Sequence, residues 1–538
     1  MNTRMTAIAT LLLAGLSLTS ARTAPQSQPA GTLAASAPPA FSDPGRRAKL
    51  AGAFAGIDRL FQDFVTRGNI PGAAWGIVVD GELAHSGTMG LRDVASKAPV
   101  MPDTVFRIAS MTKSFTAMAI LKLRDEGKLS LDDPAERYVP ELKGLRYPTA
   151  DSPRITIRHL LSHAEGFPED NAWADRHLAD SREQFSRMLE RGLPFSNAPG
   201  LAYEYSNYGF AILGRIVSGA SGVPYNEFIE ASLLRPLGMT STTLEPRSVP
   251  RDRLALGYRW EDGRWVEEEL LADGAFGAMG GMLTSVPDLA KYVGALLSAW
   301  PPRDGPEGGP VRRASLREMQ QVARTQPALI TRSGDTGAIE LSAGGYGFGL
   351  RISQTCDFGL IVAHGGGLPG FGSIMRWLPE YGVGIIAFGN LTYTGWSGVT
   401  GTAFERLSAT GGLQPRVVQP SPALVEARDA VSRLIARWDD TEIDRIAADN
   451  LFLDRSKERR RADLDALRSK VGLCKAAQAF DYLENALRGE WTLSCERGDV
   501  RASVTLAPTM PPRVQVMQAR AVPANAPPRH RQACPEGR

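Results

Sequence analysis

Residues 106–113, Phe-Arg-Ile-Ala-Ser-Met-Thr-Lys, mark the point where an extended stretch of the chain gives way to a helix. Beyond Met111, apolar side chains recur with the spacing of one helix face through Leu123. Before this stretch, apolar runs at 73–79 and 82–87 flank Asp80-Gly81. That dipeptide accepts the positive φ angles of a tight turn, so these runs predict a β-hairpin.

Much of the stretch 121–300 is helical in pattern, and strand-like runs return only after it. The expected strands are 345–352, 359–364, 372–378 and 382–390; the expected helices include 210–218 and 287–297. We therefore predict one antiparallel sheet assembled from both ends of residues 51–410. The helices between form a second lobe, with a cleft between sheet and lobe. The fold class expected is α/β, of the α+β kind.

Segments outside this domain have different compositions. Residues 1–21 have the charged start, apolar centre and small-residue end of a signal peptide, which predicts a secreted or periplasmic protein. Residues 22–50 are rich in Ala, Pro and Ser and indicate a disordered leader, although helical spacing already begins at Asp43 and continues to Arg67. Residues 411–422 indicate a linker and 523–538 a flexible tail.

A small α+β domain is expected over residues 423–522. Helices are predicted at 424–438 and 456–470, and strands at 482–488, 490–495, 500–506 and 513–520. This coarse pattern resembles an NTF2-like cone fold. The run Arg459-Arg460-Arg461 in the second helix is interpreted as a solvated face.

Charge and cysteine content narrow the possible partners. With 61 basic and 58 acidic residues the net charge is +3, which gives no reason to expect nucleic acid or a membrane surface as partner. No run after the leader is long and apolar enough for a membrane anchor. The four cysteines allow three pairings, of which we favour Cys474 with Cys495, leaving Cys356 and Cys534 as the remaining pair.

The first candidate for chemistry is Ser110 with Lys113, the only Ser-x-x-Lys in the chain. On a helix, side chains three residues apart share one face, so the Lys113 amine reaches the serine hydroxyl. A buried lysine loses its proton readily and then serves as a base. A serine at the start of a helix also has a backbone N–H that can donate to an oxyanion. The alternative is a surface serine and lysine on an ordinary helix.

Two further motifs supply groups that such a serine needs. Tyr205-Ser206-Asn207 offers a phenol, which a nearby cation depresses toward phenolate, and an amide that holds Lys113 or a substrate amide. His364-Gly365-Gly366-Gly367 ends an apolar strand. There, glycines such as Gly366 let a substrate lie against the strand edge, and the Gly367 N–H donates to the oxyanion.

In their order, these motifs resemble those of the serine β-lactamase and penicillin-binding-protein superfamily, in its class C-like branch. The resemblance spans residues 58–406 and includes Thr156–His163, Gly280–Met282 and Tyr346–Leu350. It implies a two-lobe domain of the β-lactamase/transpeptidase type. It also implies an acyl-enzyme on Ser110, with proton transfer shared by Lys113 and Tyr205.

The third motif departs from the family. Lys-Thr-Gly is usual there, whereas this chain has His364-Gly365-Gly366. A histidine of ordinary pKa near 6.5 is only partly charged at neutral pH, so it grips a substrate carboxylate less firmly than lysine. The resemblance therefore implies hydrolysis of a small ester, amide or D-amino-acid peptide, with weak or no β-lactamase activity. A non-catalytic binder of peptides or cell-wall fragments is the alternative.

Neither a metal nor a cofactor is expected. His159 and His163 have a spacing that suits zinc, but no third ligand and no intervening glutamate accompany them.

Overall fold

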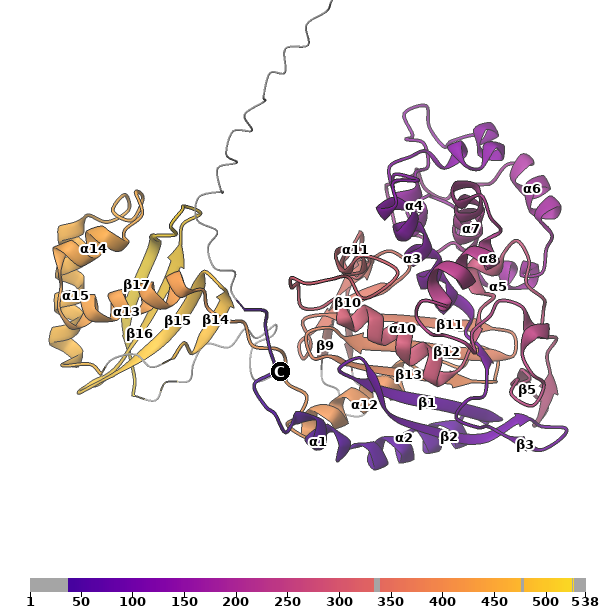
Figure 1. Cartoon of the computed structure of the whole chain (residues 1–538), viewed down its shortest axis with the longest axis horizontal. Helices are drawn as coiled ribbons and strands as arrows, with labels where there is room; N and C mark the ends of the chain where they lie inside the picture. Colours follow the sequence, from indigo (N-terminus) through magenta and orange to yellow (C-terminus); the bar gives the residue numbers. More distant parts are fainter. Residues whose placement is uncertain (1–36, 333–338, 476–478, 525, 527–538) are drawn as a thin grey trace, which may run out of the picture. The chain divides into compact units, whose positions relative to one another are not determined.

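The computed structural model describes residues 37–332, 339–475, 479–524 and 526. It divides into two compact units (Figure 1): a large unit that begins at Pro38 and ends at Gln419, and a small unit that begins at Pro420. Within the described parts of the chain, none of the helices has the length and apolarity needed to cross a bilayer. The predicted signal peptide, most of the predicted tail and Cys534 lie outside the described residues.

The large unit contains a fully antiparallel sheet whose order is β3-β2-β1-β13-β12-β11-β10-β9-β8. Its strands are β1 (Gly72–Val79), β2 (Glu82–Asp93), β3 (Ala98–Pro99), β8 (Arg324–Arg332), β9 (Ile339–Tyr346), β10 (Arg351–Thr355), β11 (Ile361–Leu368), β12 (Phe371–Leu378) and β13 (Val383–Gly389). Ala73 pairs with Gly389 and Val79 with Val383, so strands from both ends of the unit meet in mid-sheet. This confirms the predicted assembly.

One predicted strand is broken and another was missed. Residues 345–352 form the end of β9 and the start of β10, joined by a turn in which the Gly347 N–H donates to the Leu350 carbonyl. Gly349 has a φ of +66°, and a Cβ there would lie 2.7 Å from the Lys113 carbonyl. A continuous strand would not turn here against the helix that carries Lys113. β8 was not predicted.

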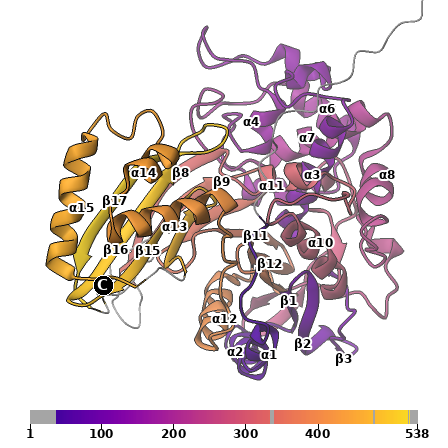
Figure 2. The ribbon, with the colours of Figure 1, turned by 60° about the vertical axis from the view of Figure 1, so that its left-hand side comes forward.

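Helices cover both faces of the sheet (Figures 1 and 2). They are α1 (Arg46–Ala51), α2 (Phe54–Arg67), α3 (Thr112–Asp125), α4 (Ile157–Leu161), α5 (Asn171–Ala174), α6 (Arg182–Glu190), α7 (Asn207–Ser221), α8 (Tyr225–Ile229), α9 (Gly277–Gly280), α10 (Val286–Ser298), α11 (Arg313–Met319) and α12 (Ser397–Ala409). Every residue of β1 is buried, Trp75 and Ile77 in the core with α2 and α12, Ala74 and Val78 in the core with α3 and α10. The two-residue period of the strand thus separates two cores.

The large unit starts earlier and ends later than predicted. Arg46 is buried and donates to Asp80 at 2.6 and 2.7 Å, so residues 46–50 belong to the fold and the boundary predicted at 50/51 is wrong. Helix spacing from Asp43 to Arg67 resolves into two helices, α1 and α2. In the predicted linker, Leu413 is buried in the core beneath α2 and α12.

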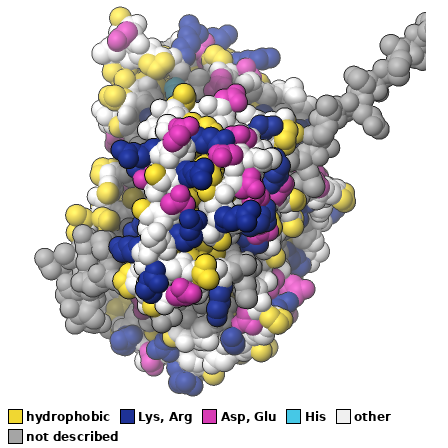
Figure 3. All heavy atoms as spheres, turned by 90° about the vertical axis from the view of Figure 1, so that its left-hand side faces the viewer, with side chains coloured by type: hydrophobic (Ala, Val, Ile, Leu, Met, Phe, Trp, Pro, Cys, Tyr) yellow, Lys and Arg dark blue, Asp and Glu magenta, His cyan; other side chains and the backbone are white. Residues whose placement is uncertain are grey.

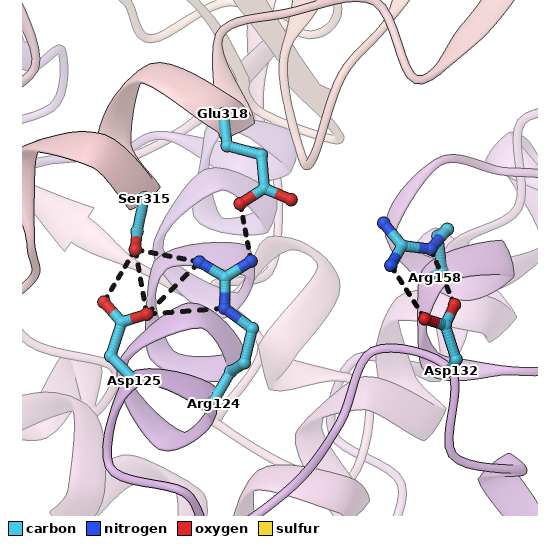
Figure 4. A network of polar contacts seen from close by, with 6 residues as sticks. All are labelled: Arg124, Asp125, Asp132, Arg158, Ser315 and Glu318. Atoms are coloured by element: carbon cyan, nitrogen blue, oxygen red, sulfur yellow. Dashed lines mark hydrogen bonds and ion pairs between the residues drawn. The ribbon is translucent and has the colours of Figure 1, made fainter.

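The C-terminal end of α3 is held by a polar network (Figure 4). Arg124 donates to Ser315 and Glu318 on α11, and Ser315 donates to both carboxylate oxygens of Asp125 at 2.7 and 2.8 Å. Nearby, Arg158 donates twice to Asp132. This network ties α3 to α11 at the end of the helix opposite Ser110.

The small unit places helices against a four-stranded antiparallel meander. It contains α13 (Pro422–Ala436), α14 (Asp440–Ile446), α15 (Lys457–Val471), β14 (Tyr482–Asn485), β15 (Arg488–Cys495), β16 (Gly498–Leu506) and β17 (Val514–Val522). α14 was not predicted. Cys474 and Cys495 form the favoured disulfide, which confirms that pairing.

The arginine run on α15 is not wholly solvated. Acidic and basic side chains alternate over the face that carries α14 and α15 (Figure 3), as expected of a solvated surface. Arg460, however, is buried and donates to the carbonyls of Leu451 and Met517 and to Asp454. For Arg460 the interpretation as a solvated residue is wrong.

Candidate active site

Ser110 lies in a 3₁₀ turn, η1 (Ala109–Met111), directly before α3. Ala109 has a φ of +49°, a conformation that is uncommon for a residue other than glycine. Two distant segments of the chain hold this turn in place: the Ile108 N–H donates to the Met282 carbonyl, and the Ser373 hydroxyl on β12 donates to the Ile108 carbonyl at 2.8 Å. The backbone strain therefore sits beside the candidate nucleophile.

Lys113 is fully buried one helical turn beyond Ser110. Its amine donates to Ser110 Oγ at 3.1 Å, to Asn207 Oδ1 at 2.6 Å and to the Met279 carbonyl at 2.8 Å. All three acceptors are neutral. Burial lowers the pKa of Lys113 to about 7; Asp170 and Asp175 act against this shift. At neutral pH a substantial fraction of Lys113 is therefore an uncharged amine, able to accept a proton.

Asn207 is the first residue of α7, and two residues hold it in place. Asp170 accepts the backbone N–H groups of Asn207 at 2.7 Å and Tyr208 at 2.9 Å, which satisfies donors at the helix N-terminus. Asn171 Oδ1 accepts from Asn207 Nδ2 at 3.1 Å. The amide oxygen of Asn207 thereby faces Lys113. Sequence reasoning did not identify Asp170, Asn171 or Met279 as site residues.

Tyr205 is buried beside both candidate catalytic groups. Its phenol hydrogen-bonds to Ser110, and the Lys113 amine lies 4.9 Å from its ring centroid. Burial raises the pKa of Tyr205 well above its ordinary value, and the hydrogen bond to Ser110 only partly opposes this. The expected shift toward phenolate is therefore wrong: Tyr205 is a neutral phenol that is hydrogen-bonded to Ser110.

His364 is buried and neutral. Its Nδ1 donates to the Gly365 carbonyl at 2.6 Å, because a carbonyl only accepts, and its Nε2 accepts from the Tyr346 hydroxyl at 2.9 Å. Burial, and then the charges of Arg351 and Lys113, lower the pKa of His364 to about 3. The partial positive charge expected for this residue is absent at neutral pH.

The glycines after His364 let β11 approach the turn that carries Ser110. A Cβ on Gly366 would lie 2.1 Å from the Ile108 carbonyl, and one on Gly367 would lie 2.8 Å from the Tyr393 ring. β11 pairs with β12 as far as Leu368 but with β10 only as far as Ala363. The backbone edge from His364 onward thus has no ladder partner on the β10 side, and η1 lies beside this strand.

Arg351, at the start of β10, is a charged residue that sequence reasoning missed. Its guanidinium carbon lies 5.6 Å from the Tyr205 ring centroid, and the residue is exposed. Burial of the guanidinium lowers the pKa of Arg351, but the phenols of Tyr203, Tyr346 and Tyr205 outweigh it and raise the pKa. Arg351 directly follows the motif Tyr346–Leu350, and this position is the sequence feature that could have identified it as a site residue.

The two histidines with zinc spacing have other partners. His163 is buried and its Nδ1 accepts the Ser206 N–H at 3.1 Å, while His159 Nδ1 accepts the Thr156 N–H and caps α4. Within the described residues, no group of three or more His, Cys, Asp or Glu side chains is arranged to hold a metal ion.

Comparisons with known proteins show the family to which the large unit is similar. The Beta-lactamase family profile matches residues 57–410. Protein flp of Staphylococcus aureus (strain COL) is 28% identical over 337 residues, 62% of each chain; penicillin-binding protein 4* of Bacillus subtilis (strain 168) is 28% identical over 311 residues, 55% of this chain and 62% of that protein. The chain thus spans about three fifths of the length of these relatives.

Solved structures share the fold. The octameric penicillin-binding protein homologue from Pyrococcus abyssi superposes with a TM-score of 0.57 at 23% identity, covering 84% of this chain and 96% of that one. A class C β-lactamase superposes with a TM-score of 0.52 at 21% identity, covering 68% and 96%. The chain belongs to the Beta-lactamase family, within the superfamily of β-lactamase-like and penicillin-binding-like serine hydrolases.

Proposed function

We propose that this protein is an exported serine hydrolase that forms an acyl-enzyme on Ser110. The observation that carries the proposal is Lys113, a buried amine with only neutral acceptors, 3.1 Å from Ser110 Oγ. A lysine that loses its proton near neutral pH is a competent base for a serine hydroxyl.

The reaction proceeds in two halves. Ser110 Oγ attacks the substrate carbonyl carbon while Lys113 takes the hydroxyl proton, and the N–H groups of Ser110 and Gly367 stabilise the oxyanion. The proton then passes, through Tyr205, to the departing alcohol or amine. A water molecule attacks the ester on Ser110, and the same groups return the proton to Ser110 as the acid leaves.

Arg351 refines the substrate class. His364 is neutral and buried, so it supplies no charge for a substrate carboxylate, whereas the guanidinium of Arg351 lies beside Tyr205. A guanidinium binds a carboxylate through two parallel hydrogen bonds. We therefore propose small esters, amides or D-amino-acid peptides that carry a carboxylate on the leaving group.

Active-site labelling tests the chemistry. A fluorophosphonate probe labels the wild type and fails to label Ser110→Ala, and the labelled peptide contains Ser110. Failure of fluorophosphonate, penicillin and p-nitrophenyl ester probes alike to acylate the protein would favour the alternative of a non-catalytic binder.

A matched substrate pair tests the role of Arg351. Phenyl acetate and 3-acetoxybenzoate differ only by a carboxylate on the leaving group. We expect kcat/KM to favour 3-acetoxybenzoate by about tenfold, as expected for one charge-assisted contact, and Arg351→Met to remove the preference. If the wild type and Arg351→Met prefer 3-acetoxybenzoate equally, a residue other than Arg351 binds the carboxylate.

A further inference from the structure

A cavity in the large unit lies beside the N-terminus of α7. It has a volume of about 380 Å³, within the range of small-molecule sites. Its apolar walls come from the loop after α4, from α6 and the segment that follows, and from α7. The main apolar side chains are Phe167, Trp173, Met188, Leu193 and Tyr208.

Two polar groups in this cavity lack partners. The Tyr208 hydroxyl is buried and has no hydrogen-bond partner among the described residues, and Tyr208 is only 6% exposed. The guanidinium of Arg191 makes no hydrogen bond or ion pair with any described residue. Burial raises the pKa of Tyr208, the charge of Arg191 opposes the shift, and both residues line the cavity. A buried donor without a partner is costly and indicates a missing acceptor.

The acidic residues of the cavity are already engaged. Glu169 accepts the Asn171 N–H at 3.0 Å, and Asp170 accepts N–H groups of Asn207 and Tyr208. Arg191 is therefore the available charge. At the surface, Trp173 is 47% exposed and its ring lies nearly parallel to that of Tyr208, with centroids 6.0 Å apart.

The cavity is connected to the candidate active site through Asp170. This residue lines the cavity and holds the backbone of Asn207, whose side chain accepts from Lys113. Charged and titratable groups that act on Lys113 come from several elements: Asp170, Asp175, Tyr205, His163, His364 and Arg351. Asp170 and Asp175 favour the protonated amine. A further anion on this side of Lys113 acts in the same direction.

We propose that this cavity binds a small organic carboxylate with an aromatic or branched aliphatic body, at a site distinct from Ser110, and that its occupation slows acylation of Ser110 at neutral pH. The body fills the apolar walls, and the carboxylate accepts from Arg191 and Tyr208. The added negative charge favours the charged form of Lys113, which cannot accept the Ser110 proton. The expected slowing of Ser110 acylation rests on the proposed function.

Binding is tested first on Ser110→Ala, which leaves the cavity intact. The probe is 3-phenylpropionate, titrated by calorimetry and by intrinsic tryptophan fluorescence, with 3-phenylpropanamide as the uncharged control. We expect saturable binding that weakens by about fivefold or more for the amide and for Arg191→Gln, because a charge-assisted contact is lost. Leu193→Trp, which fills the cavity, abolishes it. No saturable binding up to about 10 mM would overturn the inference, as would equal binding of acid and amide.

Kinetics then test the coupling in the wild type. Saturating 3-phenylpropionate slows fluorophosphonate labelling at pH 7 by about twofold or more, an effect that disappears near pH 9 and in Arg191→Gln. Competition with labelling at every pH would place the probe at Ser110 itself, and unchanged labelling despite binding would remove the coupling; either result overturns the inference. If the wild type is not labelled at all, the proposed function fails, whereas the titration of Ser110→Ala judges the binding site alone.

Discussion

The two ends of helix α3 each bear a cation, in opposite surroundings. At the N-terminal end, Lys113 is fully buried and donates only to a hydroxyl, an amide oxygen and a carbonyl. At the C-terminal end, Arg124 meets the carboxylates of Asp125 and Glu318 (Figure 4), with its side chain 23% exposed. The two cations thus lie on the same helix but have different partners: neutral acceptors for Lys113 and carboxylates for Arg124.

This difference decides what each residue can do. Desolvation without a countercharge destabilises an ammonium, so the pKa of Lys113 falls to about 7 and the amine titrates near neutrality. A guanidinium between two carboxylates keeps its charge and adds only to the tie between α3 and α11. One end of the helix is arranged for proton transfer, and the other anchors it.

The largest expected effect comes from removing the lysine. Lys113→Met is expected to lower the rate of acylation by about 10³-fold or more, because the general base is lost. The matched control, Arg124→Met at the other end of the helix, keeps the rate within about threefold. Stopped-flow labelling with a chromogenic ester measures both. Equal losses in the two variants would mean that α3 responds to any lost cation and that Lys113 has no special role.

The pH dependence sharpens the contrast. Because the neutral amine is the active form, acylation rises with pH through a midpoint near 7, which follows the lowered pKa of Lys113. The charge of Arg351 contributes to that lowering, so Arg351→Met moves the midpoint upward. Initial rates from pH 5 to 11, on a neutral ester and corrected for uncatalysed hydrolysis, give both values. A midpoint that stays near 10 would show that Lys113 retains its ordinary pKa.

Replacing the cation at each end of α3 should change the free energy of unfolding in opposite directions. Between pH 7 and 10 the unfolded chain holds a proton on Lys113 that the folded protein has largely lost, so unfolding becomes less favourable as pH rises through this window. Lys113→Met removes this burial cost and is expected to raise the free energy of unfolding of the large unit at pH 7 by about 1–3 kcal/mol. Arg124→Met is expected to lower it by about 1 kcal/mol. Urea unfolding of folded, monodisperse variants measures the difference, and a destabilised Lys113→Met would contradict it.

The smallest expected effect on stability comes from replacing Glu318, an exposed ion-pair partner of Arg124. Glu318 has a 40% exposed side chain, so its ion pair with Arg124 is screened by water. Glu318→Gln is expected to cost about 0.5 kcal/mol or less and to leave acylation unchanged. A cost above about 2 kcal/mol in the same urea experiment would show that this end of α3 depends on the pair far more than its exposure allows.

Much of the large unit was predictable because local patterns record it. Asp80-Gly81 between apolar runs predicted the β1–β2 hairpin, and the runs at 372–378 and 382–390 predicted β12 and β13. Ser110, Lys113 and Asn207 were found by spacing within short motifs, and the structure brings their side chains together. The break at Gly349 was missed because its cause is the approach of the Lys113 backbone, which lies far away in sequence.

By itself, then, the sequence determined the order of most strands and helices, the resemblance to the β-lactamase family and the candidates Ser110, Lys113 and Tyr205, because hydrophobic period and motif spacing are local properties. Only the tertiary structure decided their electrostatics: the neutral acceptors around Lys113, the raised pKa of Tyr205, the neutral His364 and the arrival of Arg351 beside them. The physical reason is that a pKa depends on burial and on charges contributed by distant segments, which no short motif contains.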